Sequence, residues 1–97
     1  MTKNLQVDRE KAIAEFQKLP GVGKRIASDF WRLGIRSISD LKKWKAEDLY
    51  NYNTQLKGKT ENRALLYIMR CAIYIAKTPK EKRIPEKMIW WNWKDKR

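Results

Sequence analysis

Apolar residues recur along this chain at steps of three and four, and the alternation typical of strands is absent. The pattern predicts an all-α fold. Asp8 can cap a first helix, which Pro20 ends. The apolar residues of this helix are Ala12, Ile13, Phe16 and Leu19.

Two further helices are predicted in the next segment. One follows Gly21-Val22-Gly23, and Gly34 stands where a residue in the left-handed conformation commonly ends a helix. The other is short, from Asp40 to Trp44, with Ser39 as its N-cap. The apolar residues of the longer helix are Ile26, Ala27, Phe30, Trp31 and Leu33.

The second half of the chain predicts a fourth and a fifth helix. The fourth runs from about Ala46 to Leu56, and we expect it to bury Leu49, either Tyr50 or Tyr52, and Leu56. Gly58 follows this helix and marks the connection to the fifth helix.

Thr60 is a good N-cap for the fifth helix, from about Glu61 to Lys77, and Thr78-Pro79 ends it. Residues 64–76 are apolar nearly all round, which predicts a central helix against which the others pack. Arg70 interrupts this stretch, which is shorter than the ~20 residues of a membrane span. We therefore expect one helical domain over residues 1–79, no membrane association, and a basic, Trp-rich tail over residues 80–97 that packs on the domain.

The net charge of the chain indicates what kind of partner it binds. Among 97 residues, 23 are Lys or Arg and 11 are Asp or Glu, which gives a net charge of +12. Nucleic acid is the expected partner of such a protein. The chain has no His and one Cys, so Ser-His-Asp and Cys-His catalysis, a His-ligated or Cys-rich metal site and an internal disulfide are all excluded.

These exclusions predict a protein that is not an enzyme and needs no metal or cofactor. Cys71 lies in the apolar helix, where a thiol is usually an inert packing group. The first residues carry no apolar stretch of the kind found in secretory signals, and a lone Cys suits a reducing compartment. A cytoplasmic location is expected.

The stretch Leu19 to Arg25 carries the most specific chemistry. Gly21 and Gly23 let the backbone turn sharply, and Val22 between them can anchor the turn in the core. Amides at the start of the following helix have no intrahelical acceptor and suit a phosphate oxygen, beside which Lys24 and Arg25 add positive charge. This is the pattern of a helix-hairpin-helix motif, which binds the backbone and not the base edges. The alternative is an ordinary turn between two packed helices.

A second, weaker copy of this motif has its turn in residues 56–60. Lys57, Gly58 and Lys59 occupy its turn. Arg63 and Arg70, seven residues apart and so on one face of the fifth helix, either extend the phosphate contacts of this turn or solvate the exposed edge of the helix. The alternative is a plain helix connection with a glycine after the helix. Aligning Leu19 with Leu56 also pairs Gly21 with Gly58, Ala27 with Ala64 and Phe30 with Tyr67, but places Thr60 opposite Gly23 and Glu61 opposite Lys24.

Segments 19–23, 33–41, 66–74 and 90–95 resemble the small bacterial helix-hairpin-helix proteins of a pathogenicity-locus or mitomycin-resistance family. The resemblance covers most of the chain, and its Trp-rich ending is distinctive. It implies a tandem helix-hairpin-helix fold of about five helices and a DNA-binding role, which would fit DNA repair or damage resistance. It implies no defined reaction.

The hypothesis is therefore a DNA-binding protein that grips phosphates without reading sequence. Trp90, Trp91 and Trp93 either fold back onto the fifth helix, which we favour, or stack on unpaired bases. Other interpretations are RNA binding, or a protein-interaction scaffold in which the tail is the docking surface. A DNA lyase or glycosylase would need a catalytic Lys, for which Lys59 is the one candidate by position.

Overall fold

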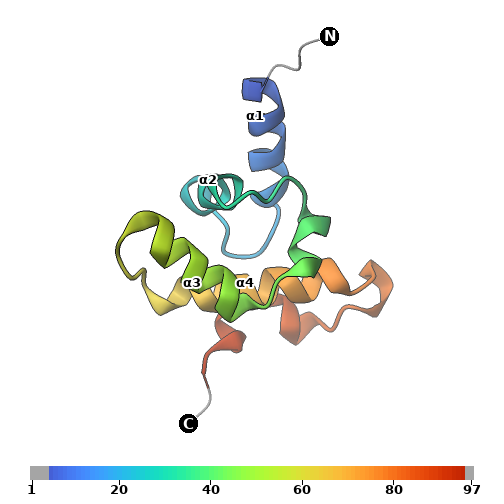
Figure 1. Ribbon diagram of the computed structural model, residues 1–97. Coiled ribbons are helices and arrows are strands. Elements are labelled where there is room, and N and C mark those ends of the chain that lie inside the picture. Colours follow the sequence, from blue (N-terminus) through green and yellow to red (C-terminus); the bar gives the residue numbers. More distant parts are fainter. Residues whose placement is uncertain (1–4, 96–97) are drawn as a thin grey trace.

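The computed structural model describes residues 5–95, and these residues form helices with no strand (Figure 1). The all-α prediction is confirmed, and the five predicted helices correspond to α1, α2, η1, α3 and α4. The helices are α1 (Leu5–Phe16), α2 (Lys24–Arg32), the 3-10 helix η1 (Ile38–Lys43), α3 (Ala46–Lys57) and α4 (Arg63–Lys77), followed in the tail by three 3-10 turns, η2 (Lys80–Lys82), η3 (Pro85–Met88) and η4 (Trp90–Trp93).

Helix α4 is the centre of the molecule, as its nearly uniform apolar sequence predicts. It packs against α3, η1 and the tail, whereas α1 packs mainly on α2 and projects away from the α3–α4 pair (Figure 1). Phe16 of α1 and Phe30 of α2 are fully buried, and their rings meet edge to face with centroids 5.5 Å apart. The buried residues of α4 are Leu65, Leu66, Ile68, Met69, Cys71, Ala72, Ile73 and Ile75.

Two predicted details of the first helices are wrong. Helix α1 already includes Leu5, so Asp8 lies in its first turn and does not cap it. Ser37, not Ser39, precedes η1, which is a 3-10 helix. There the Asp40 carboxylate accepts a hydrogen bond from the backbone N–H of Arg36 at 2.9 Å, so the chain is folded back tightly at this point. Gly34 has φ +91°, as expected of a residue that ends a helix.

The structure also differs from the prediction in two details of α3 and α4. The N-cap of α4 is Asn62, whose side-chain Oδ1 accepts from the N–H of Ala64 at 2.8 Å, so Thr60 lies in the preceding loop. Of the residues expected to be buried on α3, Leu49 and Tyr50 are buried, but Leu56 is 45% exposed. Leu56 is therefore not equivalent to Leu19, which is buried.

The tail runs back along α4. The Trp93 ring packs against Tyr74 of α4 with centroids 5.6 Å apart, and the Trp93 indole N–H donates to the carbonyl of Lys87 at 2.8 Å. The Cys71 thiol donates to the same carbonyl, and burial raises the pKa of this thiol to about 11. A thiol with so high a pKa stays protonated and serves as a packing group. Within residues 5–95, no helix is long and apolar enough to cross a membrane.

Candidate nucleic-acid interface

The first loop, residues 17–23, joins α1 to α2 through a sharp turn. Gly21 has φ +77°, a conformation that a residue with a Cβ rarely adopts. The Val22 side chain is buried and its N–H donates to the carbonyl of Leu19 at 3.1 Å, so the valine anchors the turn from inside. Gly23 is extended, with φ −90° and ψ −173°, and stands at the N-cap of α2.

The amides at the start of α2 face an open surface. Gly23 has no side chain with which to cap them, and within the described residues the N–H groups of Gly23, Lys24 and Arg25 have no protein acceptor. All three residues are exposed. A helix start with open amides carries partial positive charge, to which Lys24 and Arg25 add full charges. This arrangement suits an anionic oxygen.

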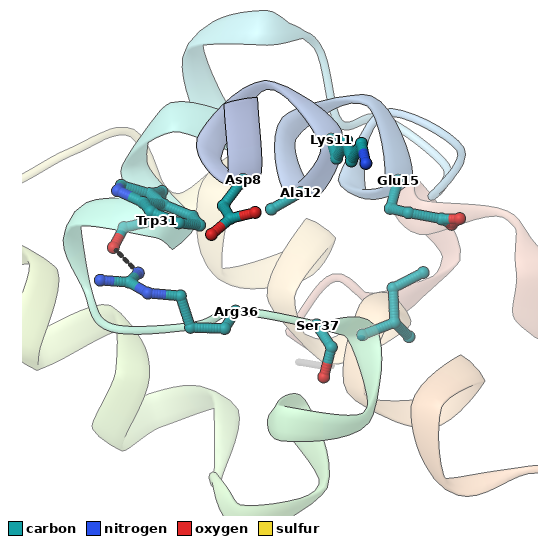
Figure 2. Close-up of a pocket in the computed structure, with 8 residues that line it drawn as sticks. Asp8, Lys11, Ala12, Glu15, Trp31, Arg36 and Ser37 are labelled. Atoms are coloured by element: carbon teal, nitrogen blue, oxygen red, sulfur yellow. Dashed lines mark hydrogen bonds between the residues drawn. The ribbon is translucent and has the colours of Figure 1, made fainter. Parts of the chain in front are cut away.

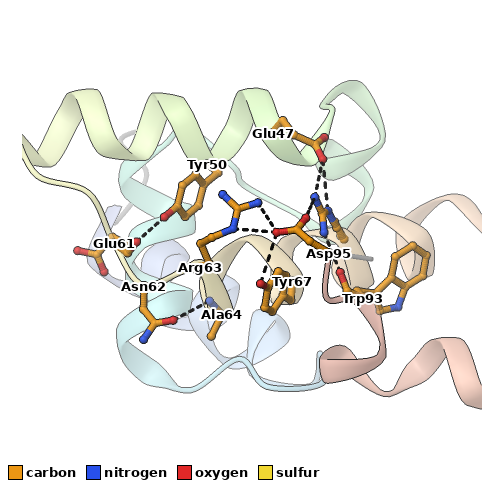
Figure 3. A network of polar contacts seen from close by, with 10 residues as sticks. Glu47, Tyr50, Glu61, Asn62, Arg63, Ala64, Tyr67, Trp93 and Asp95 are labelled. Atoms are coloured by element: carbon orange, nitrogen blue, oxygen red, sulfur yellow. Dashed lines mark hydrogen bonds and ion pairs between the residues drawn. The ribbon is translucent and has the colours of Figure 1, made fainter. Parts of the chain in front are cut away.

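The second loop, residues 58–62, is closed by one side chain of the loop, Asn62, and one of α3, Tyr50. Gly58 has φ +70° and ends α3, so it shares the left-handed conformation of Gly21. Asn62, however, occupies the Ala64 amide, and the buried Tyr50 hydroxyl donates to the Glu61 carbonyl (Figure 3). Helix α4 begins at Arg63, two residues later than the alignment of the two copies requires. Both loops therefore contain a glycine in the left-handed conformation, but the amides at the helix start are open at the first loop and partly occupied at the second.

Lys57 belongs to a buried ion cluster and not to an open surface. Its Nζ lies 3.0 Å from Asp29 Oδ1 and 3.8 Å from Glu61 Oε2, and its side chain is 15% exposed. Asp29 is also paired with Arg32 at 3.0 Å. The structure thus uses the Lys57 charge to neutralise Asp29 and Glu61, because buried carboxylates need a partner. Sequence reasoning placed Lys57 among the phosphate contacts and missed Asp29 as its partner.

Arg25 links this cluster to the first loop. Its Nη1 donates to Glu61 Oε1 at 3.1 Å, while its side chain remains 67% exposed. The hydrogen bond from Arg25, supported by the charge of Lys57, holds the pKa of the Glu61 carboxyl below its ordinary value although burial acts in the opposite direction. Glu61 therefore stays ionised, and its ion pair holds the Arg25 guanidinium toward the second loop.

Arg63 and Arg70 hold the tail. The Arg63 Nε donates to Asp95 Oδ2 at 2.9 Å, and the Arg70 Nη2 lies 2.8 Å from Asp95 Oδ1 (Figure 3). Arg70 also donates to Glu47 at 3.0 Å and to the Trp93 carbonyl at 2.8 Å. Both arginines are on one side of α4, as their spacing predicts, but a tail carboxylate occupies them. Among the predicted cations of the second loop, Arg63 and Lys59 are both exposed; Arg63 is paired with Asp95, whereas Lys59 takes part in no ion pair within the described residues.

Trp90 meets the first loop. An ideal Cβ built on Gly21 would lie 2.5 Å from Trp90 Cδ1, closer than real Cβ contacts allow. The glycine is thus required twice, for its positive φ and for the close approach of the indole ring. Sequence reasoning missed this contact, since nothing in the local pattern links residues so far apart along the chain.

A cleft of about 630 Å³ lies between α1 and the segment that joins α2 to η1 (Figure 2). Arg36 lies over the Trp31 ring, 3.7 Å from its centroid, and donates to the Trp31 carbonyl at 2.7 Å. The residues that line this cleft carry both positive and negative charges, so the cleft has no preference for an anion. The lining residues are Asp8, Lys11, Ala12, Glu15, Trp31, Arg36, Ser37 and Ile38.

The fold and the loops define a basic, all-helical protein in which open amides at the start of α2 lie beside two exposed cations. The family model Cdd1, described as "Pathogenicity locus", matches residues 9–97, and the chain belongs to this family. The resemblance to pathogenicity-locus proteins noted in the sequence is thereby confirmed. Comparisons with curated proteins and with solved structures give no match.

Proposed function

We propose that this protein is a cytoplasmic DNA-binding protein that grips the phosphate backbone without reading base sequence. The observation that carries the proposal is the start of α2, where open amides stand beside exposed Lys24 and Arg25. Backbone amides and cations recognise phosphate oxygens, which are the same for every base. In this proposal the first and second loops are the turns of two helix-hairpin-helix motifs.

The two motifs contribute unequally. The first loop supplies Gly21, Val22, Gly23, Lys24 and Arg25, with Val22 acting as the buried anchor of the turn. The second loop supplies Gly58 and the exposed Lys59, because Asn62 occupies the amide at its helix start and Lys57 is paired. The net charge of +12 attracts the polyanion at long range. No catalytic step is assigned to either loop, and any role in DNA repair or damage resistance would follow from binding.

The test is fluorescence anisotropy with labelled duplex DNA across a salt series. If about four to six phosphates are contacted, the log–log slope of affinity against salt should be about −3 to −5, at −0.9 per phosphate. Unrelated duplex sequences should bind alike. Tighter binding to duplex RNA than to DNA would replace the DNA assignment with an RNA one. A flat salt response, or no binding at low salt, would overturn the proposal and favour a protein-interaction scaffold.

A further inference from the structure

An exposed indole stands beside the first loop. Trp91 is 54% exposed, more than the other exposed large apolar side chains of residues 8–95, Leu56 and Ile84. Its ring meets the Trp90 ring edge to face, with centroids 5.5 Å apart and an interplanar angle of 87°. Trp90 in turn lies against Gly21. Trp90 therefore lies between Trp91 and the backbone of the first loop.

The turn that carries Trp91 is held firmly. On its C-terminal side, Trp93 is fixed by its indole hydrogen bond to Lys87 and by Arg70, which donates to the Trp93 carbonyl at 2.8 Å. On its N-terminal side, Trp90 packs on the loop. Trp91 is therefore presented to solvent by an ordered support, although an exposed indole is unfavourable in water. Burial of the ring within the protein does not account for its position.

We propose that Trp91 stacks on an unpaired base of a DNA strand whose phosphate is bound by the first loop. This inference rests on the proposed function and specifies the form of its substrate. A nucleotide carries its base one sugar away from its phosphate, and the structure links the exposed Trp91 ring through Trp90 to the loop that leads into the open amides. Stacking tolerates every base, which agrees with binding that does not read sequence. Bases within an intact duplex are already stacked, so the contact selects single strands, overhangs or junctions.

The charges around the ring favour a nucleic acid over an apolar protein partner. Lys24 and Arg25 stand at the loop, and exposed Lys94 follows the turn that carries Trp91. An exposed indole on a turn that adjoins the first loop and is followed by Lys94 suits a ligand that is anionic along its backbone and aromatic along its bases. A protein partner would instead need an apolar patch of matching shape, which the cations would oppose.

The experiment compares wild type, Trp91→Ala and Trp91→Phe with the tail control Ile84→Ala, whose side chain is 46% exposed. The ligands are a labelled thymidine strand, an abasic strand of equal length with the same phosphates, and a blunt-ended duplex of two fully paired strands. We expect Trp91→Ala to weaken binding of the thymidine strand about tenfold, in line with the loss of one stacked base. Binding of the abasic strand and of the duplex should not change. Trp91→Phe, which keeps a ring, should recover most of the affinity, and Ile84→Ala should behave as wild type.

The outcomes separate this inference from the proposed function. Equal loss of affinity for the thymidine and abasic strands would overturn stacking while leaving phosphate binding intact. Unchanged binding of the thymidine strand by Trp91→Ala, with wild-type duplex binding, would likewise overturn stacking while leaving phosphate binding intact. Absence of binding by wild type to all three ligands would overturn the proposed function itself.

Discussion

Lys57 at the end of α3 pairs with Asp29 in the middle of α2, with Nζ 3.0 Å from Oδ1. This ion pair joins the two helix pairs of the molecule, because Asp29 follows the first loop and Lys57 precedes the second. Asp29 is 2% exposed, so its charge is tolerated only while partners remain. The charge that sequence reasoning assigned to phosphate binding therefore serves to connect the two helix pairs.

Removing Lys57 should destabilise the fold. In Lys57→Ala, Asp29 and Glu61 lose a buried partner, and we expect the free energy of unfolding to fall by about 1–3 kcal/mol, the cost of a buried charged group left incompletely paired. Lys59→Ala removes the same charge from an exposed position and should change stability by less than about 0.5 kcal/mol. Urea unfolding of both variants measures the difference. Equal stability would show that the ion cluster contributes nothing to the fold.

Gly21→Ala tests the contact between the first loop and Trp90. The matched control is Gly58→Ala, because Gly21 and Gly58 have φ +77° and +70° but a Cβ at Gly58 would meet nothing within 4 Å. Both variants carry the strain of a positive φ, and Gly21→Ala must also displace the indole ring. We expect it to be less stable than Gly58→Ala by about 1–3 kcal/mol, the typical cost of overpacking. If Trp90→Ala in the same chain does not reduce this excess, the clash is not its cause.

The two tail tryptophans should differ in their effect on stability. Trp93 packs on Tyr74 and donates to the Lys87 carbonyl, so Trp93→Ala should lower the free energy of unfolding by about 2–3 kcal/mol, somewhat below the cost for a fully buried ring. Exposed Trp91→Ala should change it by less than about 0.5 kcal/mol. Removing residues 80–97 uncovers the same face of α4 and should cost at least as much as Trp93→Ala. Chemical denaturation of the three variants provides the comparison.

Acid should destabilise the attachment of the tail. Hydrogen bonds from Arg70 and Arg63 hold the pKa of Asp95 below its ordinary 3.8, and a backbone hydrogen bond together with Arg70 holds that of Glu47 below 4.5. A depressed pKa in the folded state stabilises the fold above the ordinary value, and this contribution is lost as the pH falls through the folded-state pKa. The free energy of unfolding should thus decline below about pH 4.5. Asp95→Asn should be less stable than wild type near neutral pH, and the difference should shrink in acid.

The sequence predicted the parts of this molecule that depend on local pattern. The helix count, the central position of α4 and the left-handed Gly34 follow from apolar spacing and glycine placement. The start of α4 was misplaced by two residues, because Thr60 and Asn62 are both good caps and the hydrogen bond from Tyr50 to the Glu61 carbonyl holds the residues before Asn62 in the loop.

The pairing of charges could not be predicted in the same way. Whether a lysine or arginine is open to a phosphate depends on carboxylates brought near by tertiary packing. Asp29 is paired with Lys57, and Asp95 with Arg63, although each pair is far apart in the chain. Local spacing identifies a basic residue but not its distant partner, and the contact of Gly21 with Trp90 is hidden for the same reason.

The last prediction concerns which cations bind the phosphate backbone. Lys24→Ala with Arg25→Ala removes the two exposed charges beside the open amides of α2. The matched control is Lys42→Ala with Lys43→Ala, which removes two exposed charges from η1 and lowers the net charge equally. If charge alone drives binding, the two double variants should lose the same affinity for duplex DNA.

We expect a difference, because only the first pair adjoins amides that can bind a phosphate at fixed geometry. The Lys24 and Arg25 variant should bind duplex more weakly than the control, with a salt slope reduced by about one to two units. Arg25 also pairs with the buried Glu61, so unfolding curves must accompany the binding data; loss of this pair should cost about 1–3 kcal/mol, because it leaves a buried carboxylate incompletely paired. Equal affinities in two folded variants would show that the start of α2 is not the principal phosphate site.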